Sequence, residues 1–66
     1  MSSRERIFQF IKDNPGTHFR QITRTLGIAV GTVQFYVNQM ERRGQIWSNR
    51  GRFLRQFYAK EKIHLD

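Results

Sequence analysis

The sequence predicts a single domain, mainly helical with a small β-hairpin, an α+β class of three helices followed by two strands. Apolar residues recur with a period of 3.6 up to Arg43, which is typical of amphipathic helices, and the period changes to 2 after Gly44. Glycine and proline separate the periodic stretches. A chain of 66 residues is long enough for one small hydrophobic core.

The first helix is expected at about residues 3–14. Ser2 and Glu5 have the spacing of a capping box, in which the serine side chain satisfies a free amide at the helix start. Pro15 disfavours helical backbone at Asn14, so the helix should end there. The expected buried stripe comprises Ile7, Phe8, Phe10 and Ile11.

The second helix is expected at about residues 18–26, opened by Thr17 or His18. Gly27 follows it as a left-handed cap. Only residues 27–29 join this helix to the next, so the two must cross at a steep angle, which is the helix-turn-helix arrangement. The residues at core spacing are Phe19, Ile22 and Leu26.

The third helix is expected at about residues 30–43 and ends at Gly44. Its inner stripe comprises Val30, Val33, Val37 and Met40. The opposite ridge carries amides, a hydroxyl and an aromatic ring, whereas a face that only meets water would more often carry Lys and Glu. Such a ridge suits contact with the edges of DNA bases. The candidate base-contacting residues are Thr32, Gln34, Phe35, Asn38 and Gln39.

A β-hairpin is expected at about residues 45–59. Its strands would span 45–49 and 52–59, with Asn49-Arg50-Gly51 as the turn because Gly51 accepts a positive φ. The second strand is apolar on both sides, so its buried face stays open between two pairs of residues. These pairs are Phe53 with Phe57, and Leu54 with Tyr58.

The charge is strongly positive. Twelve Lys and Arg against five Asp and Glu leave a net charge of +7, and nine of the twelve are Arg. Solubility alone does not require one sign of charge in one half of the chain, so a polyanion is the expected partner. Nucleic acid is favoured over acidic protein or lipid. The basic residues of the second half are Arg42, Arg43, Arg50, Arg52, Arg55, Lys60 and Lys62.

The stretch NPGTHFRQITRTLGIAVGTVQFYVNQMERRGQI, residues 14–46, resembles the core of archaeal and bacterial winged helix-turn-helix transcriptional regulators. The likeness extends over about residues 14–58. It implies that the third helix is the recognition helix, which enters the major groove, and that residues 45–59 form the wing, on the minor groove or the backbone. Two positions depart from the pattern. Val30 replaces a frequent Pro, and Gln45 replaces a frequent Leu, which we expect to loosen the start of the wing.

The resemblance also implies contacts to the DNA backbone, which position such a module without reading sequence. A second interpretation is available for each group: solvated charges on the second helix, complements to a helix dipole at the end of the third, or charges that protect a strand edge. The backbone candidates are His18, Arg20, Arg24, Arg42 and Arg43, and the wing candidates are Arg50, Arg52 and Arg55.

Other classes of protein are disfavoured. There is no Cys for a disulfide or a thiolate metal site, no apolar stretch of membrane-spanning length and no secretory signal pattern. His18 and His64 are isolated, and no nucleophile–base set or phosphate-binding glycine loop occurs, so we expect no metal, no cofactor and no enzyme activity. The expected location is the cytoplasm of a prokaryotic cell, associated with the nucleoid.

Sequence-specific binding of double-stranded DNA by a small transcriptional regulator is therefore the first hypothesis. The alternatives are a protein-interaction or assembly module acting through Phe35, Trp47 and the wing, and a sequence-neutral architectural DNA-binding protein. A homodimer is also expected. The core is small, and Phe8 and Phe10 are spread too widely for one buried face.

Overall fold

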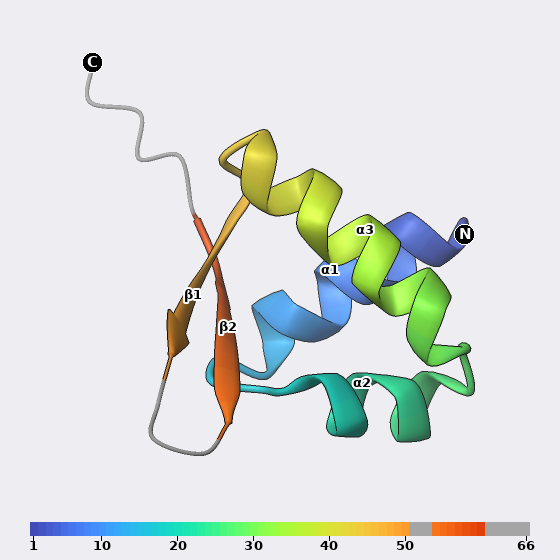
Figure 1. The fold of residues 1–66 in the computed structure, drawn as a ribbon. Coiled ribbons are helices and arrows are strands. Elements are labelled where there is room, and N and C mark those ends of the chain that lie inside the picture. The colour runs from blue at the N-terminus through green and yellow to red at the C-terminus, as the bar shows by residue number, and fades with distance from the viewer. Residues whose placement is uncertain (51–53, 61–66) are drawn as a thin grey trace.

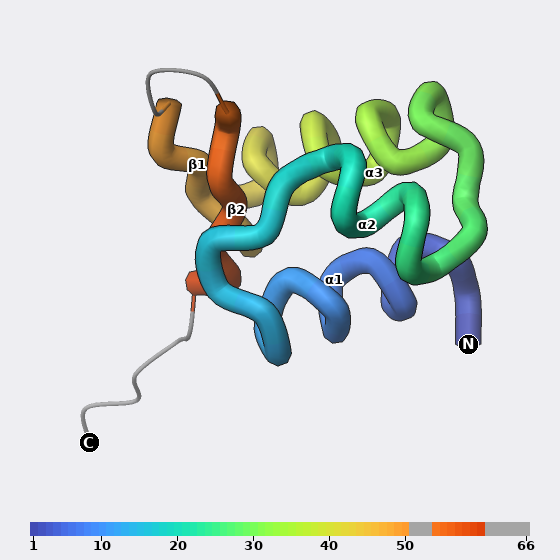
Figure 2. The backbone as a smooth tube through the Cα atoms, turned by 90° about the horizontal axis from the view of Figure 1, so that it is seen from below, coloured from blue at the N-terminus to red at the C-terminus, as the bar shows by residue number. Residues whose placement is uncertain are grey.

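The computed structural model describes residues 1–50 and 54–60. Three helices, α1 (Ser3–Asp13), α2 (Phe19–Leu26) and α3 (Val30–Arg42), precede an antiparallel hairpin of β1 (Ile46–Arg50) and β2 (Arg55–Ala59). The helices pack on one another, and the hairpin lies at the end of the molecule opposite the N-terminus (Figures 1 and 2). The predicted class, three helices with a small hairpin, is confirmed.

The core draws on all five elements. The predicted stripes of the three helices are confirmed at their central positions, and the hairpin adds one side chain from each strand. Phe8 and Phe10 are half-buried and pack against this core. Their spread along α1 therefore gives no independent reason to expect a second copy of the chain. The fully buried apolar residues are Ile7, Ile11, Ile22, Val33, Val37, Met40, Ile46 and Phe57.

The prediction that Val30 belongs to the buried stripe is wrong, because its side chain is 49% exposed. It is the first residue of α3, directly after the turn from α2. A helical wheel fixes the angle of a residue around the axis but not its position along the axis. Val33 and Val37, one and two turns further on along the same side of the helix, are fully buried.

The helix boundaries follow the local signals in the sequence. Ser2 Oγ accepts the Glu5 N–H at 3.2 Å, as expected of the capping box. His18, not Thr17, caps α2, and its Nδ1 accepts the Gln21 N–H at 3.4 Å. Gly27 ends α2 with a φ of 66°. The left-handed cap at Gly27 is therefore confirmed, and it sends the chain straight into α3.

Gly44 ends α3 in a Schellman motif. The Gly44 N–H donates to the Glu41 carbonyl at 3.0 Å, and the Gln45 N–H donates to the Met40 carbonyl at 2.9 Å. The φ of Gly44 is +74°, a conformation that costs residues with a side chain ~1–2 kcal/mol. This motif turns the chain from α3 directly into β1.

Gly44→Ala should therefore lower the free energy of unfolding by ~1–2 kcal/mol. Gly31→Ala is the matched control, because Gly31 lies in α3 with open space around its Cα. That replacement should leave stability unchanged or raise it by up to ~1 kcal/mol. Urea unfolding followed by circular dichroism measures both, and equal effects of the two variants would contradict the assigned role of Gly44.

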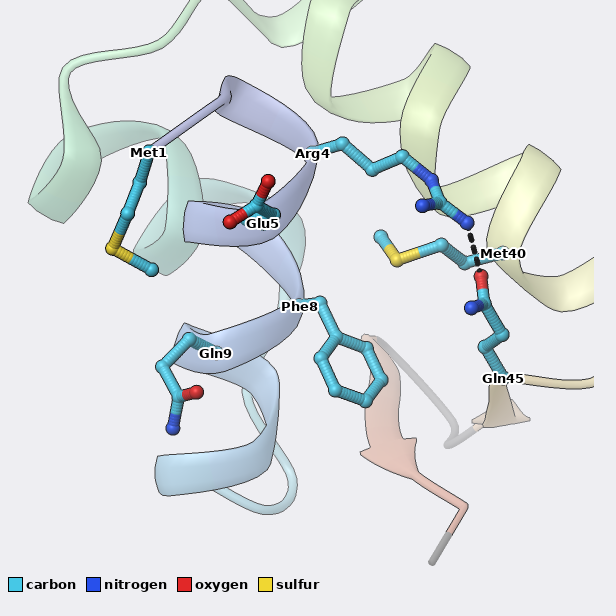
Figure 3. A pocket seen from close by; sticks show the side chains of 7 residues that line it. All are labelled: Met1, Arg4, Glu5, Phe8, Gln9, Met40 and Gln45. Carbon is cyan, nitrogen blue, oxygen red and sulfur yellow. Dashed lines mark hydrogen bonds between the residues drawn. The ribbon is translucent and has the colours of Figure 1, made fainter.

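The expected loosening at Gln45 is wrong. Arg4 Nη2, on α1, donates to Gln45 Oε1 at 2.6 Å (Figure 3). The Lys60 N–H donates to the Gln45 carbonyl at 2.9 Å. The side-chain amide of Gln45 supplies the contact to α1, which a Leu could not make. The backbone bond to Lys60, which any residue could make, joins the start of the hairpin to the residue after β2.

The predicted hairpin turn at Asn49-Arg50-Gly51 is also wrong. Asn49 and Arg50 belong to β1, where they pair with Gln56 and Arg55. The register is set by Ile46 at the base of the hairpin and Phe57 in its middle pair, which must both face the core, and counting outward from there extends the ladder to Arg50. β1 is therefore shifted by one residue, and β2 begins at Arg55 rather than Arg52.

The buried face of β2 is now decided in part. Phe57 is fully buried and Leu54 is 55% exposed, whereas Tyr58 lies on the outer face of the hairpin. There the Tyr58 ring stacks on Trp47, with centroids 4.3 Å apart and planes 16° from parallel. Trp47 thus lies on the face opposite Ile46, as the alternation predicts. Phe53 lies outside the described residues.

A third backbone segment joins the hairpin. The Gly16 N–H donates to the Phe57 carbonyl at 2.9 Å, and the Phe57 N–H donates to the Thr17 carbonyl at 2.8 Å. Thr17 is buried, and its hydroxyl donates to Gln21 Oε1 at 2.9 Å. This bridge, which the sequence did not predict, fastens β2 to the start of α2.

Candidate nucleic-acid interface

The outer ridge of α3 presents unused hydrogen-bonding groups. Gln34 and Asn38 are exposed, and Gln39 is half-buried. None of their amide groups forms a side-chain hydrogen bond with another residue of the described chain. Thr32 is exposed on the same helix. An amide that is free at both oxygen and nitrogen can pair with an adenine edge through two hydrogen bonds.

Phe35 is the large apolar side chain of this ridge and is 61% exposed. Its ring meets that of Tyr36 edge-on, with centroids 5.3 Å apart, which holds one side of the ring and leaves the rest accessible. A shallow hollow of about 360 Å³ lies beside it, lined by Phe35, Gln39, Arg42 and Arg43. An apolar ring next to free amides and guanidinium groups can contact a thymine methyl group while its neighbours bind polar atoms.

Four candidate arginines on the helices keep their positive charge unpaired. Arg20 and Arg24 are exposed on α2, and Arg42 and Arg43 are exposed at the end of α3. Across the described ranges 1–50 and 54–60, the one ion pair involves none of them. Their guanidinium groups are therefore available to phosphate oxygens, and a guanidinium group can bind a phosphate through two parallel hydrogen bonds.

His18 combines a structural and a potential binding role. Its Nδ1 accepts a backbone N–H as the cap of α2. In a neutral imidazole with Nδ1 as acceptor, the proton is on Nε2. That N–H makes no hydrogen bond within the described residues, so it could donate to a phosphate next to Arg20, at the positive end of the α2 dipole.

The three wing candidates have different surroundings. Arg50 is exposed at the end of β1. Arg52 lies outside the described residues. Arg55 is half-buried and forms an ion pair with Glu41 and a hydrogen bond with Ser48. The pairing of Arg55 with Glu41 could not be predicted from the sequence, because it depends on the strand register.

A second hollow, about 190 Å³, lies between α1, the end of α3 and the start of β1 (Figure 3). Arg4 and Gln45 bridge it, above the apolar side chains of Phe8 and Met40. It is smaller than typical sites for small molecules, which are ~300–1,000 Å³. We assign no ligand to it.

Metal-binding clusters and membrane-spanning helices were also sought among the described residues. In residues 1–50 and 54–60, no three His, Cys, Asp or Glu side chains come together in a way that could hold a metal ion. His64 lies outside those ranges. Within the same part of the chain, no helix has both the length and the apolar character needed to cross a membrane.

Comparison with known families shows to which family the chain belongs. A family described as an N-terminal HTH domain, that is, a helix-turn-helix domain, matches residues 1–65. The chain belongs to this family. A comparison of this HTH domain with curated proteins gave no significant match.

Solved structures similar to the HTH domain include three regulators. The transcriptional regulator SlyA is 17% identical with a TM-score of 0.83, over 92% of this chain and 45% of SlyA. A predicted DNA-binding transcriptional regulator from E. coli is 23% identical with a TM-score of 0.79, over 86% of this chain and 60% of that one. Streptococcus pneumoniae FabT, in complex with DNA, is 25% identical with a TM-score of 0.80, over 92% and 46%.

The chain thus spans about half the length of the regulators it resembles. Their TM-scores confirm the winged helix-turn-helix fold predicted from residues 14–46. In this fold α2 and α3 form the helix-turn-helix, and β1 and β2 form the wing.

Proposed function

We propose that this HTH domain binds double-stranded DNA as the reading module of a transcriptional regulator. α3 would enter the major groove, and the wing would contact the minor groove or the backbone. The observation that carries the proposal is the outer ridge of α3, where free amides and the Phe35 ring stand beside unpaired arginines. The likeness to FabT, whose structure contains DNA, supports it.

The roles within the proposed complex follow from the surroundings of each residue. Thr32, Gln34, Asn38 and Gln39 would select bases, and Phe35 would contact a thymine methyl group. Phosphates would be held by His18, Arg20 and Arg24 from α2, by Arg42 and Arg43 from α3, and by Arg50 and Arg52 from the wing. The proposal requires no metal, cofactor or catalysis, and it places the protein with the chromosome, in the cytoplasm of a prokaryotic cell.

Selection of bound duplexes from a random pool tests the proposal directly. We expect enrichment of a defined sequence, because the free amides on α3 discriminate between bases. Two half-sites about one helical turn apart would also support the predicted homodimer. Equal affinity for the selected duplexes and for random duplexes would instead favour the architectural alternative.

Asn38→Ala should weaken binding to the selected duplex by about 5- to 150-fold, the equivalent of one bidentate base contact worth ~1–3 kcal/mol. Binding to an unrelated duplex should change little, because phosphate contacts dominate there. Gln9→Ala is the matched control, since Gln9 is an exposed amide on α1 outside the proposed interface. Equal losses on both duplexes would contradict a base-reading role for Asn38. Fluorescence anisotropy with labelled duplexes gives both affinities.

One observation favours the protein-interaction alternative. The outer face of the wing carries the Trp47–Tyr58 stack, and Trp47 is 44% exposed. If Phe35→Ala and Trp47→Ala abolished capture of a protein partner while DNA affinity stayed unchanged, that alternative would replace the DNA-binding proposal.

A further inference from the structure

Glu41, Ser48 and Arg55 form a closed ring of contacts between α3 and the wing. Arg55 Nη2 is ion-paired with Glu41 Oε1, and Arg55 Nε donates to Ser48 Oγ at 3.1 Å. Ser48 Oγ in turn donates to Glu41 Oε2 at 3.0 Å. Both carboxylate oxygens of Glu41 and two nitrogens of Arg55 are therefore engaged within the domain.

The Arg55 guanidinium is also enclosed by aromatic rings. Its central carbon lies 5.2 Å from the centroid of Phe57 and 5.9 Å from that of Phe19. Phe19 belongs to α2, so Arg55 contacts both helices of the helix-turn-helix as well as both strands. The side chains of Arg55 and Glu41 are 28% and 24% exposed, so salt screens this pair less than a fully exposed one.

The contacts among Glu41, Ser48 and Arg55 lie where the wing has little other support. Ile46 at the base of the wing and Phe57 in its middle pair are buried in the core, and no fully buried apolar side chain lies further out among the described residues. A two-stranded hairpin is marginally stable by itself. The ring of contacts supports the outer half of the wing, where Arg50 pairs with Arg55.

The contacts with Glu41 and Ser48 also make Arg55 less available to a DNA phosphate. The Glu41 carboxylate neutralises the guanidinium and would repel an approaching phosphate, unlike the surroundings of Arg42 or Arg50. A phosphate would have to displace Glu41 and Ser48 to form a fork with Arg55. Arg55 therefore acts through the protein rather than on the nucleic acid.

We propose that Glu41, Ser48 and Arg55 form a wing clamp, a set of positioning residues that fixes the angle of the wing relative to α3. The effect of the clamp on DNA binding rests on the proposed function above. Its effect on the free protein does not, so the two can be tested separately.

The free protein provides the first test, by amide hydrogen exchange of β1 and β2 measured by NMR. Glu41→Gln and Arg55→Gln should each raise exchange in the outer half of the wing by about tenfold, and the double variant should add little, because coupled residues are not additive. Asp13→Asn and Lys12→Gln are the matched controls, with the same charge changes at exposed positions on α1. Unchanged exchange in Glu41→Gln would overturn the proposal whether or not the protein binds DNA.

DNA affinity provides a second test in which the sign of the effect decides. Glu41→Gln raises the net charge from +7 to +8, so charge alone predicts tighter binding of a duplex. The clamp predicts binding about five- to tenfold weaker, because the wing loses its fixed angle. Asp13→Asn makes the same charge change and should bind as the parent does or slightly more tightly. Tighter binding of Glu41→Gln would overturn the clamp, whereas failure of the parent protein to bind any duplex would overturn the proposed function alone.

Discussion

Raising the salt concentration from 50 to 200 mM should weaken binding of a duplex by about a thousandfold. Each phosphate neutralised by Lys or Arg releases condensed counterions, and the slope of log affinity against log salt is about −0.9 per contact. The proposed interface offers about six basic contacts. Five of them are the exposed residues Arg20, Arg24, Arg42, Arg43 and Arg50, and the sixth is Arg52. Fluorescence anisotropy titrations at four or five salt concentrations measure the slope.

Single variants separate the contributions to this slope. Arg42→Gln removes one exposed, unpaired charge and should reduce the slope by about one, with a similar loss on every duplex sequence. Arg55→Gln removes an equal charge that Glu41 already neutralises, so the slope should stay at its parent value although affinity falls. Lys12→Gln, on α1, should change neither. A slope near zero for the parent protein would contradict the DNA-binding proposal, because no phosphate contacts would then be forming.

The helices could be predicted from the sequence because their signals are local. The 3.6-residue period places Val33, Val37 and Met40 on one side of α3, and the structure buries all three. Gly27 and Gly44 both adopt positive φ, as their positions after apolar stripes indicate. Such features depend on residues within one or two turns, so a single sequence contains the necessary information.

The wing was predicted less accurately because its register depends on distant contacts. The dipeptide Arg50-Gly51 is a plausible turn by itself. The pairing is set instead by Ile46 and Phe57 entering a core built by the helices, and by the backbone bridge to Thr17. Neither constraint is visible in the local pattern of residues 45–59.

The candidate site likewise contains residues that local signals predict and residues whose surroundings depend on distant contacts. The outer ridge of α3 follows from helical periodicity, and in the structure Thr32, Gln34, Phe35 and Asn38 are exposed and Gln39 is half-buried. Arg55 was predicted as a wing contact to DNA from its charge alone, and the structure adds that it is ion-paired with Glu41. Glu41 and Ser48 lie 14 and 7 residues away from it in sequence, and the strand register is needed to bring them together. Their contacts with Arg55 could be found only from the structure.

Phe57→Ala should strongly lower the stability of the protein, and it should unfold a domain whose stability is at the lower end of the expected range. Truncating a buried Phe to Ala costs ~3–5 kcal/mol. A domain of 66 residues has a total stability of ~3–10 kcal/mol. Phe57 has no solvent exposure, and its ring meets Phe19 edge-on with centroids 4.8 Å apart. The loss therefore removes a contact between the wing and α2 as well as apolar burial. Thermal unfolding followed by circular dichroism should show a strongly lowered midpoint or no transition.

Two further variants test whether the loss of stability comes from the burial of Phe57. Leu54→Ala, also close to the wing, removes an apolar side chain that is 55% exposed and should change stability by no more than ~0.5 kcal/mol. Phe57→Leu keeps much of the apolar surface, so it should unfold cooperatively at a lower midpoint and should expose the wing amides to exchange. A Phe57→Ala protein as stable as the parent would mean that the wing does not share the helical core. The fixed angle between α3 and the wing, on which the wing clamp and the proposed reading of DNA both depend, would then have no structural basis.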